Sequence, residues 1–390
     1  MFELTPSEQL LARLIAFDTT SRNSNLSLID EVAGLLDTLG ASVRLTHDDA
    51  GGKANLYARL GGAGQDAVVL SGHSDTVPVD GQHWASDPFK LDLRDGRLFG
   101  RGSADMKGFL ACVLAAFARF AEAGVAKRLP LAIAISYDEE VGCLGVSRLI
   151  DDVLESGEAL AGCVVGEPTL MQAIVAHKGI AHWRCQVHGR AAHSSLTHQG
   201  VNAIEYAAQL VGFIRRLADT ERNAGRRVPL FDVPYNTLQT GWISGGSAPN
   251  IVPRACDFIF ECRWLPGDDP QHFYRQVAAE AERLQQEMRI TAPEAAIAFE
   301  SLVHCPAFES GEHNPLRDWL TAQGEHGRGL GVAYTTEAGH FSRLGVPAVV
   351  CGPGSIEQAH KSDEYVERSQ LALCDRWLDR LAAQLIERRI

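Results

Sequence analysis

Hydrophobic and polar positions repeat with two different periods along the chain, and this change divides it into three stretches. In the first and last stretches, short apolar runs alternate with amphipathic helical patterns, as at Met106–Glu122. The alternation predicts an α/β fold with a mostly parallel sheet sandwiched by helices, because strands buried on both faces are apolar throughout. The runs are Ala67–Leu70, Leu131–Ile135, Cys163–Val165 and Ala348–Cys351.

The middle stretch has the period of a strand with one solvent-exposed face. From Ala181 to His188, polar residues at even positions alternate with small or apolar residues at odd positions. The helical and strand patterns that follow give the order βαββαβ of a ferredoxin-like motif. We therefore predict an inserted α+β domain at 180–303, which interrupts a catalytic domain made of residues 1–179 and 304–390.

Composition narrows the class of protein. At 390 residues the chain is long enough for two domains, and its net charge of −13 argues against a nucleic-acid partner. No apolar run reaches the roughly 18 residues of a membrane span. Thr5-Pro6-Ser7-Glu8 indicates a capping box that opens a helix through about Phe17, rather than a signal peptide. The nine cysteines are scattered without a CxxC pair, so we expect a reducing, cytoplasmic location without disulfides.

Candidate ligands follow each of the four apolar strands. His73 follows the first, Glu139 and Glu140 the second, Glu167 the third, and His360 comes after a Gly-Pro-Gly turn behind the fourth. In an open α/β sheet, a ligand site lies beyond the carboxyl ends of the strands. Four strands that deliver acids and histidines to one edge predict a metal site there.

Imidazole nitrogen and carboxylate oxygen are the donors that Zn²⁺ takes when no thiolate is offered. We expect His73 and Glu167 on one Zn²⁺ ion, Glu140 and His360 on a second, and Asp105 bridging both, since a carboxylate can reach two ions. Asp75 can hold the other nitrogen of the His73 ring. Glu139, beside a ligand but facing differently, suits the general base that takes a proton from water.

Each of these residues also has an ordinary structural interpretation when it is taken alone. Asp105 is typical of a helix N-cap, Glu139-Glu140 of a solvated turn, and Asp75 of a turn before a proline. Glu167 before Pro168 suits an exposed extended segment, and a single histidine such as His73 is usually structural. The joint pattern favours the metal site.

The motifs around these residues resemble the dizinc deacylase and exopeptidase superfamily, in the family's order and over essentially the whole chain. That superfamily includes acetylornithine deacetylases, succinyl-diaminopimelate desuccinylases, aminoacylases and carboxypeptidase G-like enzymes. The segments from Thr336 to Ala338 and from Cys351 to Tyr365 look most like the acetylornithine deacetylase branch, although Gly339-His340-Phe341 departs from it. The motifs that carry the resemblance are Ser71–Pro78, Gly100–Gly108, Asp138–Glu140 and Gly166–Thr169.

The resemblance implies the same metal ligands, with Glu139 as base, Asp75 as partner of His73, and cobalt as a possible substitute for zinc. It further implies a homodimer through the inserted domain. His193, in Gly189–Ser195, would polarise the scissile carbonyl from the neighbouring subunit, and Asn250 and Arg263 would bind the substrate. On sequence alone, His193 is equally compatible with a histidine satisfied by Ser194 or Ser195, and Arg263 with a solvated arginine.

The expected activity is removal of the acetyl group from N-acetylornithine, a step of arginine biosynthesis. Deacylation of another N-acyl amino acid, with a succinyl, formyl or acetyl group, and a dipeptidase activity stay open as alternatives. A catalytically silent metal- or peptide-binding protein is the non-enzyme alternative, and the presence of Glu139 argues against it. The chain has no Gly-x-Ser-x-Gly or His-Glu-x-x-His motif, which disfavours a serine hydrolase and a zincin.

Overall fold

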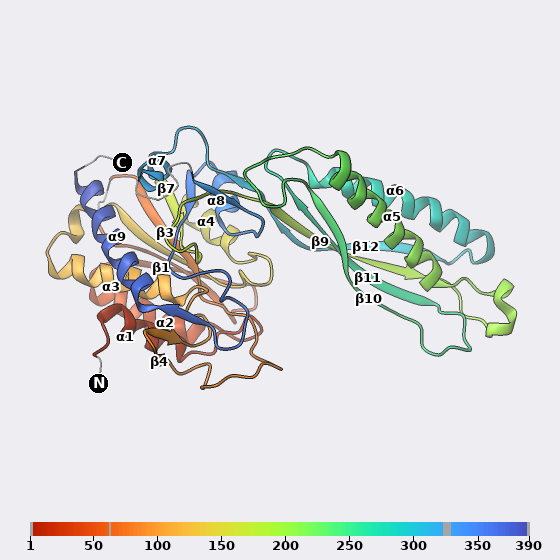
Figure 1. The fold of residues 1–390 in the computed structure, drawn as a ribbon, viewed down its shortest axis with the longest axis horizontal. Coiled ribbons are helices and arrows are strands. Elements are labelled where there is room, and N and C mark those ends of the chain that lie inside the picture. Colours follow the sequence, from red (N-terminus) through yellow and green to blue (C-terminus); the bar gives the residue numbers. More distant parts are fainter. Residues whose placement is uncertain (1–2, 62–63, 323–328, 388–390) are drawn as a thin grey trace. The chain divides into compact units, whose positions relative to one another are not determined.

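The computed structural model describes residues 3–61, 64–322 and 329–387, which divide into two compact units (Figure 1). The first unit comprises the described residues up to Ala176, Phe308–Leu330, and those from Thr336 onward. The second, here called the inserted unit, comprises His177–Ala307 and Gly331–Thr335. It extends the range 180–303 at both ends and adds a short return segment near residue 333.

The first unit contains the mixed sheet and the helices that cover it. Its helices are α1 (Pro6–Ile15), α2 (Leu26–Thr38), α3 (Lys107–Glu122), the 3₁₀ turn η1 (Ala126–Arg128), α4 (Val146–Glu155), α7 (Pro315–Thr321), α8 (Ala338–Arg343) and α9 (Arg368–Ile386). The strands in the main sheet are β1 (Ser42–His47), β2 (Ala54–Arg59), β3 (Ala67–His73), β6 (Leu131–Ser136), β7 (Leu160–Val165), β8 (Ile174–His177), β13 (Phe308–Glu309), β14 (Leu330–Val332) and β15 (Ala348–Val350). The last residue of β8 and the last two of β14 are counted with the inserted unit. A small separate sheet joins β4 (Asp92–Arg94), β5 (Arg97–Phe99) and β16 (Tyr365–Glu367).

The centre of the main sheet is parallel and buried on both faces, as the apolar runs predicted. The strand order is β1-β2-β6-β3-β7-β15-β8-β13, and β3 pairs in parallel with β6 and with β7. Every residue of β3 and β6 is buried. Alternate residues such as Leu70 and Ile133 join a core with α1, α2, α3 and α9, while α4 packs on β6 outside that core. The predicted α/β class is confirmed.

The first helix shows how local sequence sets a boundary. The Thr5 side chain accepts the Glu8 amide at 3.3 Å, and the Glu8 carboxylate accepts the Thr5 amide at 2.8 Å. This reciprocal capping box and Pro6 at the first turn start α1 where the motif predicted. The helix ends at Ile15, two residues before the predicted end near Phe17. Among the described helices, none is both long and apolar enough to cross a membrane.

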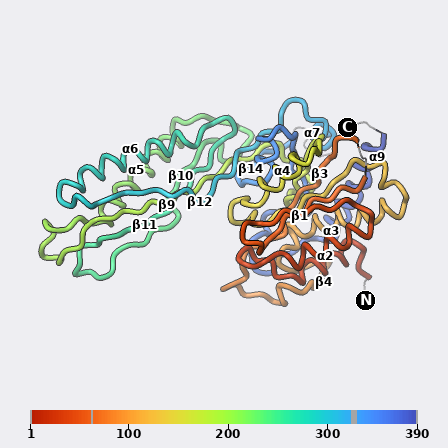
Figure 2. The backbone as a smooth tube through the Cα atoms, turned by 180° about the vertical axis from the view of Figure 1, so that it is seen from behind, coloured from red at the N-terminus to blue at the C-terminus, as the bar shows by residue number. Residues whose placement is uncertain are grey.

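The inserted unit has the predicted βαββαβ order. Its sheet runs β10-β11-β9-β12 with antiparallel pairs, and α5 and α6 lie side by side along one face (Figure 2). The small and apolar positions of β9 face these helices and form the core, where the Trp183 and Phe260 rings stack at 5.2 Å. The elements are β9 (Gly179–His188), the 3₁₀ turn η2 (Ser194–Gln199), α5 (Ala203–Ala224), β10 (Thr237–Gly245), β11 (Ala255–Trp264), α6 (Pro270–Thr291) and β12 (Ala296–Cys305).

Candidate metal centre

The parallel strands of the first unit bring the predicted ligands to one edge of the sheet. His73 is the last residue of β3, Glu140 follows the end of β6, and Glu167 follows the end of β7. Strand β15 is parallel to β7, so the loop that carries His360 begins at the same edge. Parallel register alone therefore places residues that lie far apart in the chain next to one another.

Two groups of potential metal ligands meet there, and both include Asp105. His73, Asp105 and Glu167 form one group, and Asp105, Glu140 and His360 form the other; within each group the ligand atoms lie within 4.8 Å of one another. These are the two sets that the sequence pattern predicted.

The Asp105 carboxylate faces both groups with different oxygens. Its Oδ1 atom lies 3.1 Å from Nε2 of His73, and its Oδ2 atom lies 3.3 Å from Nε2 of His360. Asp105 is not the N-cap of α3, because Met106 holds that position. The ordinary interpretation of Asp105 as a capping residue is therefore wrong, and the geometry fits a carboxylate that bridges two ions.

Burial gives this cluster an unusual electrostatic character. Burial, reinforced by neighbouring acids, raises the pKa of Glu139 to about 8 and that of Glu140 to about 7, and raises the pKa of Glu167 well above its usual range. Hydrogen bonds to Asp105 and Glu140 raise the pKa of His360 to about 10. So many buried acids around two imidazoles call for positive charge, and oxygen and nitrogen donors without thiolate suit Zn²⁺ or Co²⁺. The residues present thus fit a pair of divalent ions.

Asp75 holds this cluster through both its backbone and its side chain. The Asp75 carbonyl accepts a hydrogen bond from Nδ1 of His73 at 2.8 Å, whereas its carboxylate lies 3.6 Å from that nitrogen. The carboxylate instead accepts the amides of Glu139 and Glu140 at 3.1 and 3.2 Å and the hydroxyl of Ser21 at 2.7 Å. With Nδ1 donating to the carbonyl, Nε2 is the His73 nitrogen that faces Asp105, and it would offer its lone pair to a bound metal ion. The carboxylate was expected to hold this ring; the carbonyl is the closer partner.

Glu139 has a partner that sequence reasoning missed. The Cys143 thiol lies 3.3 Å from Oε1 of Glu139 and donates to it, because the Cys143 amide bonds the Glu139 carbonyl and folds the turn back. A cysteine four residues after an acid gives no sequence signal of such a contact.

Glu337 is buried behind the centre. It is 1% exposed, and its carboxylate accepts hydrogen bonds from the hydroxyl groups of Ser71 and Ser136. Both serines lie on the strands that carry His73 and the Glu139 turn. Glu337 therefore ties the ends of β3 and β6 together inside the first unit.

The predicted substrate contacts lie in the inserted unit. His193 is exposed, and its Nδ1 accepts the Ser195 amide at 3.2 Å, so the proton of the neutral ring lies on Nε2. Asn250 is also exposed, and its carbonyl accepts the Ser194 amide at 3.0 Å. The contact with Ser195 that could satisfy His193 is present, and it leaves an N–H donor on the opposite side of the ring.

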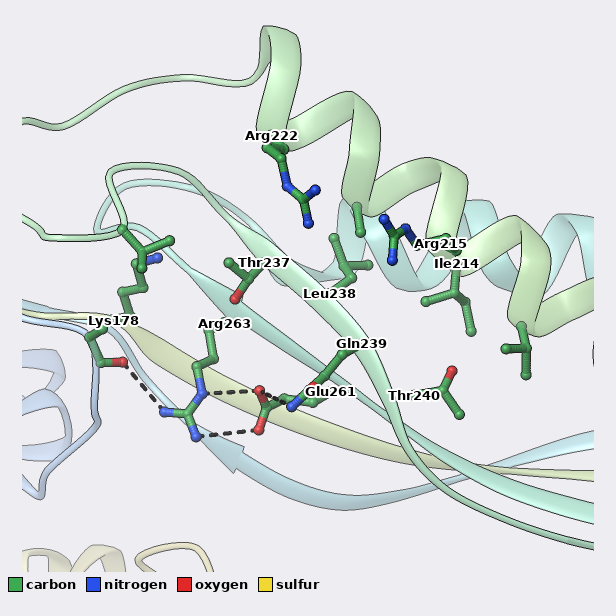
Figure 3. Close-up of a pocket in the computed structure, with 14 residues that line it drawn as sticks. Lys178, Ile214, Arg215, Arg222, Thr237, Leu238, Gln239, Thr240, Glu261 and Arg263 are labelled. Carbon is green, nitrogen blue, oxygen red and sulfur yellow. Dashed lines mark hydrogen bonds and ion pairs between the residues drawn. The ribbon is translucent and has the colours of Figure 1, made fainter.

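Arg263 lines a cavity of about 710 Å³ between α5 and the strands β10 and β11 (Figure 3). Its guanidinium group forms two ion-pair contacts with Glu261, at 3.0 and 3.3 Å, and donates to the Ala333 carbonyl at 3.4 Å. Burial alone would raise the pKa of the Glu261 carboxyl group, but the hydrogen bond from His182 and the charge of Arg263 lower this pKa to about 2. Arg263 is therefore oriented by Glu261, and Lys178, Arg215 and Arg222 add positive charge to the same cavity.

Residues 69–384 match the model of peptidase family M20/M25/M40. The acetylornithine deacetylase of Myxococcus xanthus is 35% identical over 387 residues, which cover 96% of each chain.

Solved structures share the fold at lower identity. A metallo-carboxypeptidase of the M20 family from Sulfolobus solfataricus aligns with a TM-score of 0.73 at 16% identity, covering 98% of this chain and all of that one. A dinuclear metal-binding peptidase of the same family from Bacillus subtilis aligns with a TM-score of 0.61 at 12% identity, covering 98% of both chains.

Proposed function

Because the chain belongs to peptidase family M20/M25/M40, we propose that it is a two-metal amidohydrolase that releases acetate from N-acetylornithine. It is a hydrolase, as are its relatives, and the finer assignment rests on the deacetylases that it matches over almost its full length. The observation that carries the metal-dependent part is the Asp105 carboxylate, whose two oxygens face two separate histidines.

His73, Asp105 and Glu167 would hold one ion, and Asp105, Glu140 and His360 the other. Two zinc ions, or cobalt ions in their place, would supply a water of lowered pKa and polarise the amide carbonyl. Each group offers three protein ligands, which leaves a position open for water or substrate.

Glu139 is the residue that moves the proton. It lies beside Glu140 without belonging to either ligand group, and in the metal-free chain desolvation raises the pKa of its carboxylate above the usual range. A carboxylate in this position can take the proton of the attacking water and then deliver it to the leaving α-amine. The thiol of Cys143 donates to this carboxylate and holds it in place for both transfers.

In the inserted unit, His193, Asn250 and Arg263 are the proposed substrate contacts. The Nε2–H of His193 suits a donor to the developing oxyanion, and Arg263 suits the substrate carboxylate. The resemblance to the family supports these roles, with His193 supplied by the neighbouring copy.

That assignment requires a homodimer through the inserted unit. Strand β10 is an edge of its sheet, and it exposes Trp242 at 46% and Ile243 at 51%. An edge strand with large apolar side chains can pair with its own copy around a two-fold axis. We expect Trp242→Glu to yield monomers in sedimentation, while an unchanged dimer would refute this surface.

The proposed setting is the cytoplasm and arginine biosynthesis, in line with nine buried thiols. A panel of N-acetyl, N-formyl and N-succinyl amino acids tests the activity, with each product measured in the zinc-loaded enzyme. Preference for N-acetylornithine by kcat/KM supports the proposal. Preference for another acyl group or for dipeptides overturns the substrate, and no hydrolysis of any member overturns the activity.

A further inference from the structure

His360 is the most exposed of the metal ligands. Its side chain is 54% exposed, its backbone has a φ of 63°, and it lies in a turn after β15 rather than on a strand. The other member of its pair, Asp105, is buried. An exposed ligand in a turn loses more conformational freedom on binding a metal than a buried one, unless the fold already fixes its backbone.

Asp105 is fixed by a buried ion pair. Glu364, 1% exposed, accepts the amides of Gly102, Ala104 and Asp105 at 2.9–3.0 Å, and Arg101, fully buried, donates to it at 2.7 Å. One carboxylate therefore holds the backbone of the whole loop that presents the bridging ligand. Glu364 lies only four residues after His360, so the same segment contributes to both ligands.

Gln82 connects this ion pair to His360. Its Oε1 atom accepts from Arg101 at 2.6 Å and from the Trp84 indole at 3.2 Å, which leaves its Nε2 atom directed at the His360 carbonyl, 3.1 Å away. The Arg101 guanidinium also lies 5.0 Å from the Trp84 ring centre. The donors Arg101 and Trp84 thus fix the orientation of the Gln82 amide, and its NH₂ group donates to the turn that carries His360.

We propose that Gln82 is a positioning residue that links His360 to the buried Arg101–Glu364 pair, and so sets the affinity of the ion held by Asp105, Glu140 and His360. The proposal rests on the two-metal centre described above. It goes beyond that centre because it predicts that Gln82, which contacts neither ion, affects the affinity of one ion more than that of the other. Groups that hold metal ligands in place typically contribute 10- to 100-fold to metal affinity.

The test is zinc affinity, measured by chelator competition on the full chain. Gln82→Met removes both the donor to the His360 carbonyl and the acceptor of Arg101 and Trp84, without adding charge, and keeps the length of the side chain. We expect it to weaken one of the two ions about 10-fold or more and to leave the other unchanged. His83→Ala, on the exposed neighbour in the same loop, is the matched control and should bind both ions like the wild type.

Two further backgrounds identify the weakened ion. In His360→Ala the link has no ligand to hold, so adding Gln82→Met should cause no further loss. The Glu167→Ala variant disrupts the other ligand group. In that background, Gln82→Met should lower the affinity for the remaining ion by the same factor as in the wild type. Thermal unfolding of the metal-free Gln82→Met variant should match that of His83→Ala, because a general loss of structure would lower both the melting temperature and both affinities.

The outcomes separate this inference from the proposed function. A wild-type chain that binds fewer than two zinc ions overturns the two-metal centre itself. Two ions bound equally well by the wild type and Gln82→Met overturn only the role of Gln82, as does an equal loss at both ions.

Discussion

The first unit and the inserted unit present their candidate functional residues in opposite ways. In the first unit, the candidate ligands form two groups that share the Asp105 carboxylate, and the ligand atoms of each group lie within 4.8 Å of one another. The candidate ligands are His73, Asp105, Glu140, Glu167 and His360. In the inserted unit, His193 and Asn250 are exposed on loops, and Arg263 forms an ion pair with Glu261 in a separate cavity.

The difference follows from topology. Parallel strands deliver their C-terminal residues to one edge, so the first unit assembles a complete cluster from its own chain. The antiparallel sheet of the inserted unit alternates its strand ends, so no single edge collects the loops. The first unit accordingly assembles a candidate metal site from its own residues, whereas the substrate contacts proposed in the inserted unit would act only on a bound substrate or on a second copy.

The largest effect is expected from Asp105→Ala. Because Asp105 belongs to both ligand groups, the variant should lose both ions, and activity should fall by about 10⁴-fold or more. Metal content per chain and acetate release measure the two losses together. A variant that keeps one tightly bound ion would show that the two groups do not share this carboxylate.

Glu139→Gln should separate chemistry from metal binding. The amide cannot take a proton, so kcat should fall about 10²- to 10⁴-fold while two ions stay bound. Single-turnover rates at saturating substrate, beside a zinc assay, provide the measurement. Activity near that of the wild type would remove Glu139 as the base.

Arg263→Lys should act on substrate binding alone. Lysine cannot reproduce the two parallel hydrogen bonds of a guanidinium group, so KM should rise roughly 10-fold with little change in metal content. Arg184→Lys is the control, because Arg184 pairs with Asp257 on the same sheet but lies outside the cavity. Equal effects of the two variants would contradict a specific role for Arg263.

The smallest expected effect is the pH dependence of the stability of the protein after its metal ions are removed. Burial raises the pKa of Glu139 to about 8 and that of Glu140 to about 7, above their usual 4.5. Between about pH 4.5 and pH 8, the folded chain therefore binds more protons than the unfolded chain. The stability of the first unit should therefore fall as the pH rises from about 4.5 to 8. His360, with its pKa raised to about 10, contributes a loss of the same sign above pH 6.5.

The inserted unit should behave differently in that window. The pKa of Glu261 is lowered to about 2, so its contribution is present above pH 4.5 and is lost only in strong acid. Hydrogen exchange of the chelator-treated protein at pH 5.5 and 8, corrected for the intrinsic rate, compares the two units. A first unit equally protected at both pH values would refute the electrostatic description of the cluster.

Much of the fold and the ligand sets could be predicted because both depend on local signals. Apolar runs fix the buried strands, and an acid or histidine just after each run reaches the shared edge. The alternation from Ala181 to His188 likewise predicted a half-exposed strand, and β9 has it.

The residues that hold the ligands could not be predicted in this way. Glu364 bonds the amide of Asp105 across 259 positions of sequence, and Gln82 bonds His360 across 278. No periodicity links such positions, because tertiary packing alone brings them together. For the same reason, nothing in the sequence indicated that Glu337 contacts Ser71. Nor did the sequence show that the carbonyl of Asp75, rather than its carboxylate, is the nearer partner of His73.

The most direct test is a crystal structure of the zinc-loaded chain, with anomalous scattering recorded at the zinc edge. We predict two peaks roughly 3.5–4 Å apart, one bound by His73 and Glu167, the other by Glu140 and His360, with one oxygen of Asp105 on each. A single peak, or two peaks of which only one touches Asp105, would contradict it.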